Sequence, residues 1–143
     1  MRGVVWFRTD LRIDDNPALH NALDNCEEVI GIYIFSQLQW KAHNESNVKL
    51  EFLLENLTLL EKSLSKLNIP LITINTDSFD SLPKDLCSFV VSNKVGQIFW
   101  NNEFGVNESK RDLLSSAILE KENVKTSRFD DQVIYQPGYL KTG

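Results

Sequence analysis

VIGIYIF, at residues 29–35, is an unbroken apolar run with the length of a β-strand. A strand with one face in water alternates apolar and polar residues, and this run shows no such alternation, so we expect both of its faces to be buried. GVVWF, at residues 3–7, has the same character. Strands of this kind are typical of a parallel sheet that is covered by helices on both faces.

Strand-length runs and helical patterns alternate along the whole chain. We predict strands at residues 3–7, 29–35, 70–75, 97–100 and 124–129. We predict helices that begin at Asp15-Asn16-Pro17 and that cover residues 46–67, 81–92 and 106–120. In the longest helix, leucines recur every three or four residues from Leu50 to Leu67, and we expect this stripe to belong to the core.

The order βαβαβαβαβ with right-handed crossovers predicts a three-layer, doubly wound (Rossmann-like) α/β domain. We expect a five-stranded parallel sheet with strand order 3-2-1-4-5. In such sheets ligands bind outside the carboxyl ends of the strands, where the winding direction reverses. The expected crevice therefore lies between the first and fourth strands, and the loops at residues 8–16, 36–46 and 101–109 form its walls.

The composition indicates a soluble globular protein. The 143 residues are 42% hydrophobic and 24% charged, and the formal net charge is −5. Because no basic run is present, we do not expect this chain to bind DNA tightly alone. Cys26 and Cys87 are expected to be free thiols, and the histidines are too few and too far apart to suggest a metal. No signal peptide or membrane-length apolar run is found, so we expect a cytoplasmic protein with no membrane partner.

The loop NNEFGVNES, at residues 101–109, carries the candidate ligand-binding residues Asn107 and Glu108. No GxGxxG, GxxxxGK[ST] or nucleophile elbow follows any predicted strand, so the sequence lacks a dinucleotide fingerprint, a P-loop and a Ser-His-Asp signature. In one interpretation, Asn107 or Glu108 caps the next helix and complements its dipole. In the other, Glu108 accepts two hydrogen bonds from a planar heterocycle with adjacent N–H groups, such as a pterin.

Four segments resemble the DNA photolyase/cryptochrome family, in the family's order. WFRTDLRIDDNPAL (6–19) resembles its N-terminal signature. QWKAHN (39–44) and NNEFGVNESKRD (101–112) resemble segments of the folate-type cyclobutane pyrimidine dimer photolyases. FDDQVIYQPG (129–138) resembles the stretch that leaves the family's α/β domain. The resemblance spans essentially the whole chain.

The resemblance implies that residues 1–130 are the α/β domain, which holds an antenna chromophore, often methenyltetrahydrofolate. Residues 131–143 would begin the linker to a missing C-terminal helical domain, which holds the catalytic FAD and binds UV-damaged DNA. The full-length protein would then be a deoxyribodipyrimidine photo-lyase, a flavoprotein of light-driven DNA repair. This fragment alone would not be catalytic, and we expect weak self-association through its exposed domain interface.

The resemblance also implies roles for individual residues. Asn107 and Glu108 match the family's folate-binding Asn-Glu pair, with Glu108 facing the pterin, and His43 is a further folate contact. Arg8, Asp10 and Arg12 would hold the loop after the first strand and the interface to the helical domain, whereas Trp6 and Trp100 would be packing residues.

Three alternatives remain open at the level of sequence. The chain could belong to a DASH-type or sensory cryptochrome, because the residues that separate these proteins from photolyases lie mostly in the absent half. It could be a stand-alone nucleotide-binding α/β protein, although no phosphate-cradling Gly-rich loop is found. The crevice could also hold a flavin, a deazaflavin or no antenna, and Glu108 argues for a pterin because a carboxylate disfavours a phosphate-bearing ligand.

Overall fold

The structure is a computed structural model that describes residues 1–36 and 47–131. Its strands are β1 (Arg2–Phe7), β2 (Glu28–Ser36), β3 (Leu71–Thr76), β4 (Gln97–Asn101) and β5 (Lys125–Phe129). Its helices are α1 (Pro17–Asn25), α3 (Asn47–Ser65), α4 (Leu82–Ser92) and α5 (Val106–Lys121). Every predicted strand and helix is present, and its ends differ from the prediction by two residues or fewer.

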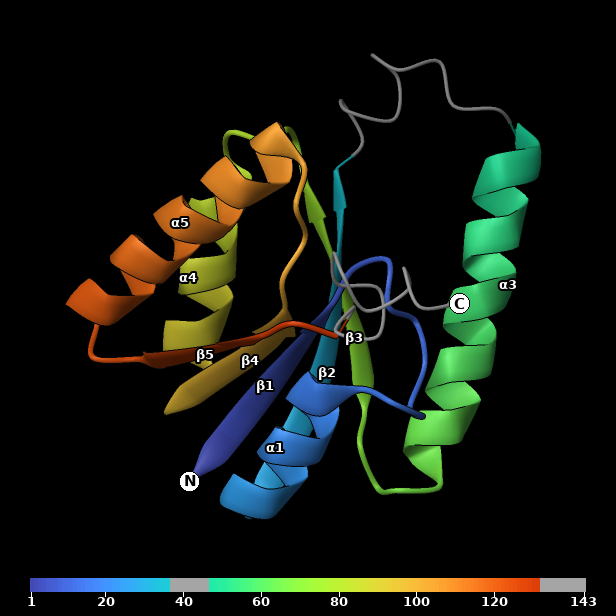
Figure 1. The fold of residues 1–143 in the computed structure, drawn as a ribbon, viewed down its shortest axis with the longest axis horizontal. Helices are drawn as coiled ribbons and strands as arrows, with labels where there is room; N and C mark the ends of the chain where they lie inside the picture. The colour runs from blue at the N-terminus through green and yellow to red at the C-terminus, as the bar shows by residue number, and fades with distance from the viewer. Residues whose placement is uncertain (37–46, 132–143) are drawn as a thin grey trace, which may run out of the picture.

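The strands form one parallel sheet with the order β3-β2-β1-β4-β5, which confirms the predicted topology (Figure 1). β1 is central, because Val4 pairs with Ile30 of β2 on one side and with Ile98 of β4 on the other. Parallel strands end at the same edge of a sheet. The loops that follow β1, β2 and β4 therefore start close together although they are far apart in the sequence.

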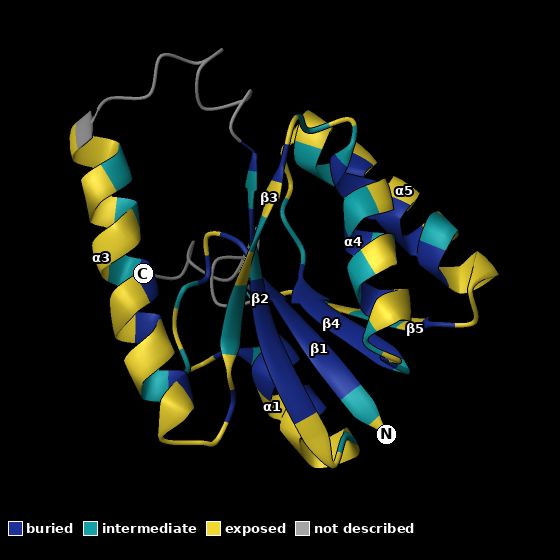
Figure 2. Cartoon of the chain, turned by 180° about the vertical axis from the view of Figure 1, so that it is seen from behind, coloured by how far each residue is buried: buried dark blue, intermediate teal, exposed yellow. Residues whose placement is uncertain are grey.

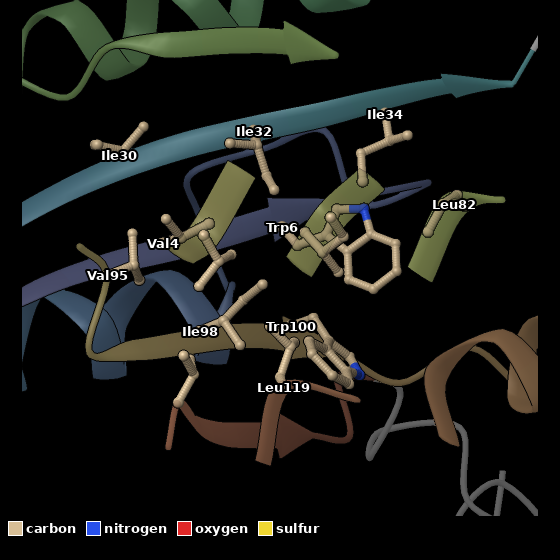
Figure 3. Packing of buried hydrophobic residues seen from close by; sticks show 13 residues of the cluster. Val4, Trp6, Ile30, Ile32, Ile34, Leu82, Val95, Ile98, Trp100 and Leu119 are labelled. Atoms are coloured by element: carbon tan, nitrogen blue, oxygen red, sulfur yellow. The ribbon is translucent and has the colours of Figure 1, made fainter. Parts of the chain in front are cut away.

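Helices cover both faces of the sheet, α4 and α5 on one face and α1 and α3 on the other (Figures 1 and 2). A hydrophobic core lies on each face of the sheet, and successive residues of β1 point to opposite cores. Trp6 packs on the α4/α5 side and Phe7 packs on the α1/α3 side. This is why the strand runs lack polar alternation. Figure 3 shows the α4/α5 core, where Trp6 and Trp100 are completely enclosed, as their expected packing role requires.

Two local predictions are confirmed in detail. α1 begins with Asn16 as its N-cap, since the Asn16 Oδ1 atom accepts a hydrogen bond from the Leu19 N–H at 3.2 Å, and Pro17 follows at the first helical position. Cys26 and Cys87 are free thiols, and burial raises the pKa of both.

The prediction for the leucine stripe of α3 is wrong for part of the helix. Leu57, Leu60 and Leu64 are buried, but Leu54 and Leu67 are exposed, and much of α3 is coloured as exposed in Figure 2. The buried leucines lie where α3 meets the sheet, and a Cβ atom on Gly31 of β2 would lie only 3.2 Å from the Leu64 Cδ1 atom. An apolar stripe is core only where another layer covers it. Within residues 1–36 and 47–131, no helix has the length and apolar character needed to cross a membrane.

Candidate functional site

The carboxyl edge of the sheet is built around a buried ion pair between Arg8 and Asp112. Arg8 directly follows β1, and its Nη1 and Nη2 atoms donate to the two carboxylate oxygens of Asp112 at 2.8 and 3.2 Å. The Arg8 Nη2 atom also donates to the main-chain carbonyl of Asn101 at the end of β4. Arg111 donates from Nε to the same carboxylate at 3.0 Å. This pairing joins β1, β4 and α5 at one point.

A second group of polar residues fills the space between the ends of β1 and β4. The Asn101 Nδ2 atom donates to Asp10 at 2.6 Å and to Asn16 at 2.8 Å, and its Oδ1 atom accepts from the main-chain N–H of Ala18 at 3.1 Å. Asp10 also accepts from the main-chain N–H of Arg8 at 2.8 Å. We expected a ligand crevice at this place, but these buried side chains occupy it.

The predicted role of Arg8 and Asp10 in holding the loop after β1 is confirmed by these contacts. Both side chains are buried inside the domain, so little of their surface is free for a second domain. Arg12 also holds this loop, because it donates to the main-chain carbonyls of Asp14 and Asp15. Unlike Arg8, it is partly exposed and forms a 3.0 Å ion pair with Asp131, beyond the end of β5.

Arg111 continues the network towards Glu103, in the loop after β4. Its Nη2 atom donates to a carboxylate oxygen of Glu103 at 2.7 Å, and the Thr9 hydroxyl donates to the other oxygen at 2.8 Å. Burial alone would raise the pKa of the Glu103 carboxyl. The hydrogen bond from Arg111, the positive charge of Arg8 and the hydrogen bond from Thr9 outweigh it and hold this pKa below its usual value. Glu103 is therefore a fixed negative charge at this edge.

The indole of Trp6 lies against both arginines. The guanidinium carbon of Arg8 is 4.4 Å from the centre of the Trp6 ring, and that of Arg111 is 5.0 Å from it. Trp6 also meets Trp100 edge to face, with ring centres 5.3 Å apart. These cation–π and aromatic contacts fix the orientation of the Trp6 ring.

A cavity of about 300 Å³ opens beside Trp6 on the α4/α5 face of the sheet. It is lined by Trp6, Arg8, Thr9, Tyr33, Ile34, Ser36, Phe79, Leu82, Glu103, Glu108 and Arg111. The cavity lies over the ends of β1 and β2, with the loop after β4 and the start of α5 as a further wall. Its volume is at the lower end of the range of small-molecule sites, which is about 300–1,000 Å³. The predicted loops at residues 8–16 and 101–109 both contribute to its lining, although the hollow is displaced from the β1–β4 junction, and residues 37–46 of the third predicted loop lie outside the described residues.

Glu108, but not Asn107, lines this cavity. The structure assigns the N-cap of α5 to Gly105, with no side-chain capping hydrogen bond, so Asn107 is an exposed first-turn residue and does not cap the helix. Glu108 lies in the first turn, where its charge complements the helix dipole. Its carboxylate also rests against Gly105: a Cβ atom there would lie 2.7 Å from the Glu108 Cδ atom. His43 lies outside the described residues.

Sequence reasoning missed several residues of the cavity. Glu103 and Arg111 lie inside a motif that carries the resemblance but receive no role there, Tyr33 lies in a run predicted as a buried strand, and Phe79 lies in a segment for which no role is predicted. Burial raises the pKa of the Tyr33 hydroxyl to about 12, and the negative charge of Glu103 adds to this effect while Arg111 opposes it. Tyr33 could have been predicted from its position near the carboxyl end of a strand, because ligands of parallel sheets bind at that edge.

A family model for DNA photolyase matches residues 3–143. The chain belongs to the DNA photolyase family. Its N-terminal α/β fold is shared by both photolyases and cryptochromes among solved structures. The chain aligns with a photolyase from Sulfolobus tokodaii with a TM-score of 0.77 and 26% identity, over 91% of this chain and 29% of that one. A Synechocystis cryptochrome aligns with a TM-score of 0.78 and 21% identity, over 90% of this chain and 27% of that one, which supports the fold.

Sequence relatives of this photolyase-family chain carry two kinds of name. A deoxyribodipyrimidine photo-lyase from Escherichia coli is 36% identical over 141 residues, which are 98% of this chain and 29% of the relative. Another from Buchnera aphidicola is 34% identical over 135 residues, or 94% of this chain and 28% of the relative. Cryptochrome-1 from Arabidopsis thaliana is 31% identical over 136 residues, or 94% of this chain and 19% of the relative. The chain thus spans less than a third of the length of these relatives.

Proposed function

We propose that this chain is the antenna domain of a deoxyribodipyrimidine photo-lyase and that it binds methenyltetrahydrofolate in the cavity beside Trp6. Excitation would pass to FAD in a C-terminal helical domain, which would carry out light-driven repair of cyclobutane pyrimidine dimers in UV-damaged DNA. The observation that supports this proposal is the position of Glu108: its carboxylate lines a cavity that has aromatic walls, at the edge where the family's motif residues meet.

The residues of the cavity fit a pterin ring. Tyr33 and Phe79 provide flat apolar surface, and Glu108 provides a carboxylate that can accept from adjacent N–H groups. The volume of about 300 Å³ suits a two-ring head group and leaves the rest of a folate outside. When bound, the folate would supply the absorption of light, and these side chains would hold its ring.

The charges around the cavity favour the same ligand. Glu103 and Glu108 line it, and both Glu103 and Asp112 compensate the lining cations Arg8 and Arg111. No lining cation is therefore left without a carboxylate partner among the described residues. A phosphate-bearing ligand would meet uncompensated negative charge at Glu108, whereas an N–H donor would find an acceptor.

A titration with methenyltetrahydrofolate, followed by absorbance and fluorescence, tests the proposal. We expect saturable binding by the wild-type chain and a loss of about tenfold or more in affinity, or about 1.4 kcal/mol, for Glu108→Ala. Glu108→Gln should also weaken binding, because an amide of the same shape accepts fewer hydrogen bonds and has no charge. Glu61→Ala, which removes an exposed carboxylate from α3, is the matched control and should bind as wild type.

The titration also separates the proposal from its rivals. Equal binding by wild type, Glu108→Ala and Glu61→Ala would mean that Glu108 serves only the start of α5. The Sulfolobus tokodaii photolyase is described with two FAD molecules and a novel light-harvesting cofactor, so FAD is the competing ligand to titrate. Tighter binding of FAD than of folate would mean that the cavity binds a flavin and not a pterin. We include Asn107→Ala and His43→Ala, because both residues are proposed folate contacts on the strength of the motif.

Photolyase and cryptochrome assignments are distinguished by the activity of a full-length protein that also contains the flavin-binding part. Relatives with both names match this chain: the Escherichia coli photo-lyase is 36% identical over 98% of it, and Cryptochrome-1 is 31% identical over 94% of it. Light-dependent repair of dimer-containing DNA by a protein that also includes the flavin-binding part would support the photolyase assignment. Binding of both chromophores without repair would favour a cryptochrome.

A further inference from the structure

The outward side of α3 combines apolar and charged side chains. Val48, Phe52 and Leu59 are 74%, 67% and 61% exposed. They point away from the buried leucines of the same helix, and Figure 2 shows α3 as an outer layer of the domain with much of its surface exposed. A helix at the surface of a domain normally has polar residues on its outward side, so these three apolar side chains require an explanation.

The exposed residues have the spacing of a helix–helix contact. Six of them follow one another at alternating intervals of four and three residues, which is the heptad spacing of two packed helices. We call these six residues the α3 stripe: Val48, Phe52, Glu55, Leu59, Lys62 and Lys66. The buried leucines occupy the other side of the helix, so the described part of the domain does not use the stripe for its own packing.

The charges of the α3 stripe change sign along the helix. Glu55 lies in its first half, with Glu51 beside it one turn earlier, and the two lysines lie at its end. None of these four residues forms an ion pair with another described residue. The other exposed charges of α3, Lys49 and Glu61, lie to the sides of the stripe. A second stripe packed antiparallel would place lysines against glutamates at both ends of the contact, whereas a parallel one would place like charges together.

A hollow of about 410 Å³ lies at the middle of the stripe. Its lining residues all belong to α3 and are Leu54, Glu55, Thr58 and Leu59. When two helices pack, a side chain of one inserts between four neighbouring side chains of the other, and these four residues form such a group. In an antiparallel pair with Glu55 opposite Lys62, the twofold axis lies near Thr58 and Leu59. Leu59 of each copy would then meet the hollow of the other.

We propose that a second copy of this chain docks antiparallel on the α3 stripe. A twofold contact uses the same surface on both partners, and the stripe is complementary to itself in its charges as well as its apolar residues. The contact follows a single helix and is therefore small, so we expect a weak dimer that dissociates on dilution. α3 covers the face of the sheet opposite to the cavity that Glu108 lines (Figure 1), so the inference does not depend on the proposed function.

Sedimentation equilibrium of the 143-residue chain over a range of concentrations tests the proposal. We expect a monomer–dimer equilibrium for the wild type. Leu59→Glu should weaken the dimer by at least about tenfold, because its carboxylate would be buried at the centre of the contact. Leu113→Glu is the matched control, since Leu113 is 59% exposed on α5, and this variant should dimerise as the wild type does.

An exchange of charges tests the antiparallel arrangement. Glu55→Lys and Lys62→Glu should each weaken their homodimer by about fivefold or more, because each variant brings like charges together at two places. An equimolar mixture of the two variants should form a heterodimer with nearly the wild-type affinity, because opposite charges meet again at both places.

Each other outcome contradicts the proposal. A wild-type chain that stays monomeric up to about 1 mM would exclude a second copy as the occupant of the stripe. A dimer that Leu59→Glu leaves intact, or that only Leu113→Glu dissociates, would place the contact on another surface. Absence of the heterodimer from the mixture would exclude the antiparallel arrangement. Folate titration of the same proteins separates the two proposals: dimerisation without folate binding contradicts only the antenna function, and folate binding without dimerisation contradicts only this inference.

Discussion

Arg8 and Asp112 are 104 positions apart in the sequence and form a bidentate ion pair beneath the carboxyl edge of the sheet. Only 6% and 5% of their side-chain surfaces are exposed. Arg111 donates to the same carboxylate and also pairs with Glu103, so two carboxylates compensate two buried cations. The pair joins the loop after β1 to α5 and thereby holds two walls of the candidate antenna cavity in place.

Removing the charge of Asp112 should strongly destabilise the domain. In Asp112→Asn, Arg8 loses its charged partner and becomes a buried cation without a carboxylate, and breaking a buried ion pair from one side costs about 3–5 kcal/mol. Urea unfolding followed by tryptophan fluorescence measures the loss. Asp24→Asn, at an exposed position of α1, is the control and should unfold nearly as wild type. Similar midpoints for both variants would show that the pair adds little to stability.

Asn101 should matter more than its neighbour Asn102. Asn101→Ala removes one hydrogen bond each from Asp10, Asn16 and the buried N–H of Ala18, and leaving buried polar groups unsatisfied costs about 1–3 kcal/mol. The Asn102 side chain bonds to Asp130 in an exposed position, so Asn102→Ala should cost less. Chemical denaturation of the two variants compares them directly. A larger loss for Asn102→Ala would contradict the central role of the Asn101 cluster.

Tyr33 should titrate later than a solvent-exposed tyrosine. Its pKa of about 12 in the folded protein lies above the value of about 10 that is usual for an unfolded chain. Because the folded pKa is raised, the contribution of Tyr33 is fully present below pH ~10 and is lost as the pH rises towards ~12. Phenolate absorbance should therefore show a late component that Tyr33→Phe removes. Its absence in the wild type would mean that the hydroxyl is more solvated than the cavity geometry indicates.

Gly105 should be needed for ligand binding more than for folding. Its φ of −65° is open to any residue, but a Cβ atom would collide with the carboxylate of Glu108. Gly105→Ala should therefore displace Glu108 and weaken folate binding by about tenfold, as Glu108→Ala does. The double variant should be no weaker than either single variant, because both changes remove the same contact. Additive losses would show that the two residues act separately.

The sequence alone determined the sheet and its topology, since strand runs and helix signals are local. The apolar runs at residues 3–7 and 29–35 predicted buried parallel strands, and Asn16 and Pro17 predicted the start of α1. A motif sufficed to select Glu108, which does line the cavity. Each of these features depends on neighbouring residues, so its pattern is visible in a short segment.

The tertiary structure decided which faces are covered and which side chains meet. α3 and α5 both carry several leucines, but only those that contact another layer of the domain are buried, such as Leu64 and Leu119, whereas Leu59 and Leu113 are exposed. Nor could spacing reveal that Arg111 pairs with Glu103 or that Asn101 fills the expected crevice. Such contacts depend on the order of the strands in space, because that order, and not distance along the chain, brings the ends of β1, β2 and β4 to one edge.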